Sequence, residues 1–171
     1  MAGWRVRAYS RDVDLYVPQV SADAVEIVEL ELRARHGATF RLDVTTGENL
    51  WGPILVRDIA SSPMLGTIGD LELRALRIED LFLLKLAASR ERDLEDLDLL
   101  APRTTADALV ERWNQLVVWH GDRHAILGFA DALVIHLRRL YGSSPAAVIG
   151  RLEITAGQRE LLLDSYNGKQ S

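Results

Sequence analysis

Two short stretches near the N-terminus alternate polar and apolar residues, as strands with one buried face do. Residues 12–17 read Asp-Val-Asp-Leu-Tyr-Val, and residues 39–45 read Thr-Phe-Arg-Leu-Asp-Val-Thr. Between them, apolar residues recur at helical spacing over residues 21–36, and Gly37 follows where a left-handed residue commonly ends a helix. The pattern predicts a strand, a helix and a second strand, without indicating whether the two strands run parallel.

The rest of the chain changes from turns to helices. Glycine and proline interrupt residues 46–69, and residues 71–76 are typical of another strand. Helical patterns follow at residues 79–89, 91–100, 105–119, 124–141 and 158–166. We therefore expect an α+β fold, with a small mixed sheet flanked by helices and a C-terminal helical extension. The seam is expected near Pro102, which divides the chain into an α/β core at 1–101 and a helical region at 102–171 packed on it.

Length and composition narrow the class of protein. The chain has 171 residues, about one domain's worth, with ordinary apolar and charged fractions of 48% and 26%. The absence of cysteine excludes disulfide scaffolds and thiolate zinc sites, and the net charge of -5 argues against broad nucleic-acid binding. Neither an apolar signal segment nor a run long enough to span a membrane occurs, so we expect a cytoplasmic protein without a membrane partner.

Three aspartates fall on the two N-terminal strands. Asp12 and Asp14 are two residues apart, so both leave the same face of the first strand, and adjacent strands would bring Asp43 beside them. Carboxylates that share a face suit the binding of divalent metal ions for phosphoryl transfer, and without a cation they repel one another. A solvated strand face, or neutralisation by Arg41 or Arg57, would account for the same pattern without a metal ion.

Lys85 is unusual in this sequence. Of the 20 basic residues only Lys85 and Lys169 are lysines, and Lys85 lies in the 79–89 helix among leucine, phenylalanine and alanine. Burying an unpaired ammonium group costs on the order of several kcal/mol, so this group must reach a carboxylate, a phosphate or water. Two interpretations stay open: a ligand for phosphate, or a structural lysine that snorkels or forms a salt bridge with Asp93 or Asp96.

Three segments of the sequence together resemble the minimal nucleotidyltransferase superfamily. They are Arg-x-x-Ser-x-Asp-Val-Asp-Leu at 7–15, a third aspartate at 43, and Glu-Asp-Leu-Phe-Leu-Leu-Lys-Leu-Ala-Ala-Ser-Arg-Glu-Arg-Asp-Leu-Glu-Asp at 79–96. The chain looks most like the abortive-infection-type nucleotidyltransferase toxins and their uncharacterised bacterial relatives, over residues 5–100. The later block, with Lys-x-x-Ala-x-Arg-x-Arg-Asp-x-x-Asp, is more specific than Asp-x-Asp alone.

The resemblance implies a nucleotidyltransferase-like fold and a role for each matching residue. Asp12, Asp14 and Asp43 match the family's catalytic aspartates, which hold Mg²⁺. The positions that the resemblance places at the nucleotide are Ser10, Lys85, Arg92, Asp93 and Asp96. The implied activity is Mg²⁺-dependent transfer of a nucleoside monophosphate from a nucleoside triphosphate (NTP) to a hydroxyl group on RNA or protein.

The sequence departs from the family before the first strand. Family members usually have a helix there, opened by a Gly-Ser or Gly-Gly pair whose amides cradle the triphosphate. Only eleven residues precede Asp12, no helix fits among them, and Gly3 is not followed by serine or glycine. We expect either that the chain begins further upstream or that the cradle is lost. Loss of the cradle favours an alternative function, a catalytically degenerate nucleotidyltransferase-fold protein that acts as a binding or regulatory partner in a toxin–antitoxin system.

Overall fold

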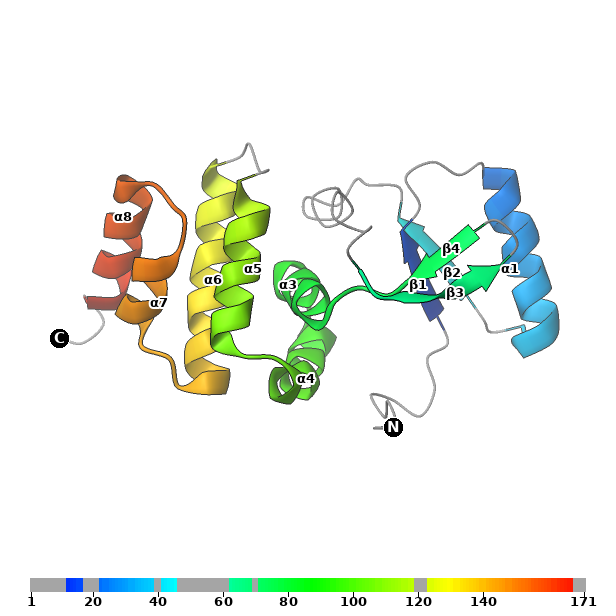
Figure 1. The fold of residues 1–171 in the computed structure, drawn as a ribbon, viewed down its shortest axis with the longest axis horizontal. Coiled ribbons are helices and arrows are strands. Elements are labelled where there is room, and N and C mark those ends of the chain that lie inside the picture. The colour runs from blue at the N-terminus through cyan, green and yellow to red at the C-terminus, as the bar shows by residue number, and fades with distance from the viewer. Residues whose placement is uncertain are drawn as a thin grey trace. The chain divides into compact units, whose positions relative to one another are not determined.

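The computed structural model describes residues 12–16, 22–38, 41–45, 62–68, 71–118 and 123–167. By contact, the chain divides into two compact units, Met1–Val56 and Arg57–Ser171. Figure 1 labels the helices and strands of both units. Each unit has an architecture of its own, the first built on a strand pair and the second mostly on helices.

The first unit contains a parallel strand pair joined by a helix. β1 spans Asp12–Tyr16, α1 spans Ala22–His36 and β2 spans Arg41–Thr45. β1 and β2 pair in parallel along their whole length. A parallel pair needs a crossover of about a dozen residues or more, and the 15-residue helix α1 provides it. The predicted succession of strand, helix and strand is confirmed, and the structure adds that the strands are parallel.

The described part of the second unit begins with a short hairpin. β3 spans Met64–Ile68 and β4 spans Leu71–Arg74, and the two strands pair antiparallel. At the base of the hairpin, the Arg74 guanidinium donates a hydrogen bond to the carbonyl of Ser62 at 3.0 Å. The strand predicted at 71–76 is confirmed as β4, whereas β3 lies in the glycine- and proline-rich stretch where we expected turns.

Helices and their short connections make up the rest of the described part of the second unit. They are α3 (Ile78–Ala88), α4 (Glu91–Leu100), the short 3₁₀ helix η2 (Ala101–Arg103), α5 (Ala106–Val117), α6 (Arg123–Tyr141), α7 (Pro145–Arg151) and α8 (Ala156–Asn167). α3 packs against α4, α5 and α6, and α7 packs against α6 and α8. Phe82 of α3, Trp113 of α5 and Leu133 of α6 are completely buried between these helices. The burial that the apolar sequence of α3 predicts is confirmed.

The fold class expected from the sequence is wrong. Seven α-helices dominate the described residues, and the strands there form two separate pairs rather than one mixed sheet flanked by helices. Every buried apolar side chain that the structure describes lies between Phe82 and Leu162, in the helices or in the residues that join them. Because a pair of strands offers too little surface for a core, the packing of helix on helix provides it instead.

The boundary between the compact units also differs in position from the expected seam. It falls between Val56 and Arg57, whereas the sequence suggested a division near Pro102. The reason is that the buried side chains of α3 pack on α5 and α6, which joins the first helices after the hairpin to the C-terminal helices. A core shared in this way joins the helices from α3 to α8 into one helical body.

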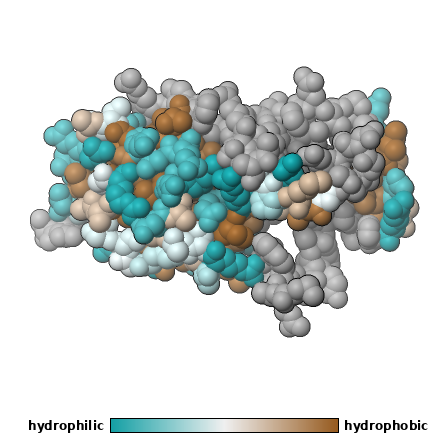
Figure 2. All heavy atoms as spheres, in the orientation of Figure 1, coloured by the Kyte–Doolittle hydropathy of each residue, from teal (hydrophilic) through white to brown (hydrophobic). Residues whose placement is uncertain are grey.

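The surface of both units mixes polar and apolar side chains. Figure 2 shows hydrophobic residues scattered among hydrophilic ones over the helices of the second unit and beside hydrophilic ones over α1. The large apolar side chains that stay exposed include Ile27 and Leu30 of α1 and Leu161 of α8. Within the described ranges, no helix has both the length and the apolar character needed to cross a bilayer.

Candidate functional site

The parallel strands place the acidic positions of the first unit next to one another. Asp14 lies opposite Asp43 in the register, and Asp12 comes two residues earlier on β1. Paired positions of parallel strands face the same side, as do positions two apart along a strand, so all three share one face of the pair. For the backbone positions, the expectation that the second strand brings Asp43 beside Asp12 and Asp14 is confirmed.

Arg41 occupies the same face of the strand pair, opposite Asp12. The register therefore supports both explanations drawn from the sequence, a bound divalent cation and neutralisation by Arg41. The side chains of these strands lie outside the described residues, as do Ser10 and Arg57. The backbone register thus places the three acidic positions close together, and a measurement of metal binding distinguishes the two explanations.

Lys85 lies between two carboxylates of the following helix. Its Nζ atom is 3.0 Å from Oδ2 of Asp96 and 3.4 Å from Oδ1 of Asp93. Ser89 ends α3 in the left-handed conformation and α4 begins two residues later, so the last turn of α3 contacts the first turns of α4. The salt bridge, one of the two interpretations of Lys85, is therefore confirmed. Contact between Lys85 and a nucleotide phosphate stays a prediction.

Asp93 is the most enclosed member of this ion cluster, with a side chain that is 0% exposed. Its Oδ2 accepts hydrogen bonds from the backbone amide of Arg90 at 3.1 Å and from Nε of Arg90 at 2.7 Å. Burial by itself would raise the pKa of Asp93, but the hydrogen bonds and charge of Arg90 and the hydrogen bond from Lys85 outweigh it and lower the pKa to about 2. An acidic residue at the third position of a helix, as here, commonly caps the helix N-terminus.

The low pKa of Asp93 predicts a loss of stability in acid. Because the folded-state pKa lies below the ordinary value of 3.8, the contribution of the carboxylate is complete above pH 3.8 and is lost as the pH falls through about 2. We expect up to about 2 kcal/mol of the free energy of unfolding to disappear over this interval. Urea unfolding at several pH values measures it, and Asp93→Asn should flatten the same part of the profile. An unchanged profile in Asp93→Asn would contradict the assignment.

An almost fully buried ion pair between α3 and α5 was not foreseen from the sequence. Nε of Arg112 is 2.5 Å from Oδ1 of Asp80, and Nη2 is 3.2 Å from Oδ2. The guanidinium therefore donates hydrogen bonds to both carboxylate oxygens. The side chains are 6% and 1% exposed. A signal was present in the sequence, because Arg112 falls between Leu109 and Trp113 on the apolar stripe of its helix. A charged residue at such a position requires a buried partner.

The structure brings the sequence-predicted site residues into two groups. Asp12, Asp14 and Asp43 belong to the first unit, whereas Lys85, Asp93 and Asp96 form the ion cluster of α3 and α4 in the second unit. The side chain of Arg92 lies outside the described residues, although its backbone is part of α4. The convergence of the two groups in one cleft stays a prediction.

The described side chains form no further candidate metal site, and the comparisons with known proteins point to no site. In the part of the chain whose side chains are described, no three histidine, aspartate or glutamate residues are grouped so that they could hold a metal ion. Comparison of the chain with protein-family models, curated proteins and solved structures gave no match. The candidate site therefore rests on the residues and register of this chain alone.

Proposed function

We propose that the shared face of β1 and β2 binds Mg²⁺ and that the protein transfers a nucleoside monophosphate from an NTP to a hydroxyl group on RNA or protein. The observation that carries this proposal is the register of the parallel strands, in which Asp14 lies opposite Asp43 and two residues after Asp12. Three acidic positions on one face of a single strand pair are costly unless a cation compensates them.

The donor set fits Mg²⁺. Asp12, Asp14 and Asp43 offer carboxylate oxygens, the hard ligands that this ion takes in preference to nitrogen or sulfur. When bound, the ion would neutralise charge on the triphosphate and orient it. Carboxylates that leave room for water and phosphate oxygens are the usual form of such a site, because Mg²⁺ gives up its water molecules reluctantly.

In the proposed reaction, the acceptor oxygen forms a bond to the α-phosphorus while the bond from that phosphorus to the bridging oxygen of the β-phosphate breaks. Pyrophosphate leaves, and the hydroxyl proton passes to the carboxylate of Asp43 as a general base. The role proposed for Lys85 is to steady the phosphates, and Asp93 has hydrogen bonds from Arg90 that do not depend on the ammonium group. We propose a cytoplasmic location because the reaction uses cellular NTPs.

The proposal is tested by transfer of a labelled α-phosphate. The full chain is incubated with each common NTP carrying the label, with bulk RNA and protein as acceptors, and with or without Mg²⁺. We expect label to enter an acceptor only when Mg²⁺ is present, with release of pyrophosphate in equal amount. Absence of transfer from every NTP, with Mg²⁺ or Mn²⁺, would count against catalysis.

A non-catalytic partner is the second candidate, and the ion pairs of Lys85 favour it. Asp93 and Asp96 already neutralise the ammonium group, so Lys85 has a structural role that needs no nucleotide. In this case the protein acts as a binding or regulatory partner, for example in a toxin–antitoxin system. Asp12→Asn separates the candidates, because it leaves the biological effect of a binding partner unchanged and abolishes that of a transferase.

A further inference from the structure

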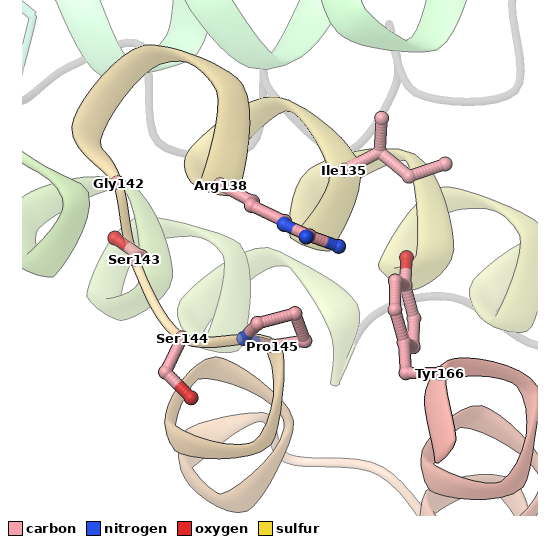
Figure 3. Close-up of a pocket in the computed structure, with 7 residues that line it drawn as sticks. All are labelled: Ile135, Arg138, Gly142, Ser143, Ser144, Pro145 and Tyr166. Atoms are coloured by element: carbon pink, nitrogen blue, oxygen red, sulfur yellow. The ribbon is translucent and has the colours of Figure 1, made fainter. Parts of the chain in front are cut away.

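A pocket lies among the C-terminal helices, in the second unit. It has a volume of about 570 Å³ and is lined by Ile135 and Arg138 of α6, residues 142–145 and Tyr166 of α8. Figure 3 shows the guanidinium of Arg138, the ring of Pro145 and the phenol of Tyr166 turned toward the same space. The volume falls within the range of about 300–1,000 Å³ that is typical of small-molecule sites.

Arg138 brings a charge into this pocket that pairs with none of the described carboxylates. Among the described residues its guanidinium forms neither a hydrogen bond nor an ion pair, whereas the adjacent Arg139 pairs with Asp98 at 2.7 Å. The chain has 25 acidic residues against 20 basic ones, so acidic partners are not scarce. Both arginines lie in the last turn of α6, where either one complements the helix dipole. Of these two arginines, Arg138 is the one whose guanidinium donors no described residue occupies.

Tyr166 forms a neutral wall of the pocket. Its hydroxyl donates a hydrogen bond to Oδ1 of Asp131 at 2.8 Å. Burial above all, together with this hydrogen bond and the charge of Asp131, raises the pKa of Tyr166 against the opposing effect of Arg138. The phenol therefore stays protonated at neutral pH and adds no negative charge to the pocket. The same hydrogen bond engages one oxygen of the Asp131 carboxylate.

We propose that this pocket binds a small organic anion, whose carboxylate or phosphate group contacts the guanidinium of Arg138 while its apolar part lies against Ile135, Pro145 and the ring of Tyr166. The planar fork of an arginine matches the oxygens of both anionic groups, and the aliphatic and aromatic walls suit a hydrocarbon or aromatic body. The site lies wholly within the second unit and is independent of the proposed transfer reaction.

Benzoate and phenyl phosphate are the probes that test this proposal. Amide chemical shifts of the full chain are followed by nuclear magnetic resonance as each probe is added, with the neutral benzyl alcohol as a third titration. We expect saturable shifts at residues 135–145 and at Tyr166, with a Kd of about 1 mM for the better anion and at least about tenfold weaker binding of the alcohol. The preferred anion identifies the group, carboxylate or phosphate, that the natural ligand carries.

Two matched variants give the decisive comparison. Arg138→Gln should weaken binding of the preferred anion at least tenfold, whereas Arg139→Gln, at the neighbouring position, should change it less than about twofold. Both side chains are exposed, so neither variant should lower the unfolding temperature appreciably. No saturable shift up to about 10 mM probe, or equal affinity in the two variants, would overturn the proposal.

Discussion

Replacement of Arg112 by methionine is expected to lower the free energy of unfolding by about 3–5 kcal/mol. The substitution leaves the carboxylate of Asp80, which is 1% exposed, without the guanidinium that binds both of its oxygens. Desolvation of that charge then loses the compensation that the guanidinium of Arg112 provides, so the contact between α3 and α5 weakens. Urea unfolding followed by far-ultraviolet circular dichroism measures the change.

Two further variants show whether the lost pair causes this effect. Arg151→Met removes an arginine whose ion pair with Asp107 is exposed, so it should cost no more than about 1 kcal/mol. Combining Arg112→Met with Asp80→Leu removes both buried charges and should recover much of the lost stability, because an apolar pair can replace a buried ion pair. A loss in Arg112→Met no greater than that in Arg151→Met would contradict the account.

Asp14→Asn is expected to reduce nucleotidyl transfer at least about 100-fold. The variant removes the carboxylate that lies opposite Asp43 in the register, so the face of the strand pair loses one of its three acidic groups. Initial rates of label transfer from an NTP at saturating Mg²⁺ measure the change. The free energy of unfolding in the absence of metal should be unchanged or higher, since repulsion between the paired positions is relieved.

Asp23→Asn is the matched control for this substitution. Asp23 is an exposed aspartate in the first turn of α1, in the same unit but away from the strand register. Its replacement should leave the transfer rate within about twofold of the unmodified chain and should cost about 0.3–1 kcal/mol of stability through the helix dipole. Equal rates in Asp14→Asn and the unmodified chain would remove Asp14 from the site.

Local sequence signals predicted the elements better than their assembly. Alternation at 12–17 and 39–45 identified β1 and β2, and the apolar character of residues 79–89 identified the buried helix α3. The prediction of how the elements assemble was wrong because strand pairing depends on contacts between distant segments, which periodicity does not specify. The predicted mixed sheet gave way to helix packing because α5 and α6 bury Trp113 and Leu133 against α3.

In the candidate site too, contacts between residues close in the sequence were predicted, whereas contacts between distant residues were not. Asp93 and Asp96 were foreseen as partners of Lys85 because all three lie within 12 positions, on helices joined by a short turn. Arg112 and Asp80 are 32 positions apart, and only the helix packing shows that they meet. The pocket around Arg138 and Tyr166 likewise needs α8 to return to α6. Spacing alone does not distinguish Arg138 from Arg139.

Binding of NTP measured by isothermal titration calorimetry, with and without Mg²⁺, tests the central claim that the strand carboxylates hold a divalent cation for a nucleotide. The account predicts a Kd below about 1 mM when Mg²⁺ is present, loss of binding when it is removed, and loss of the metal dependence in Asp14→Asn. NTP binding that is equally weak with and without Mg²⁺ would contradict the claim. So would Mg²⁺ binding that is undetectable in the unmodified chain and appears in Arg41→Gln, because Arg41 would then neutralise the aspartates in place of a metal ion.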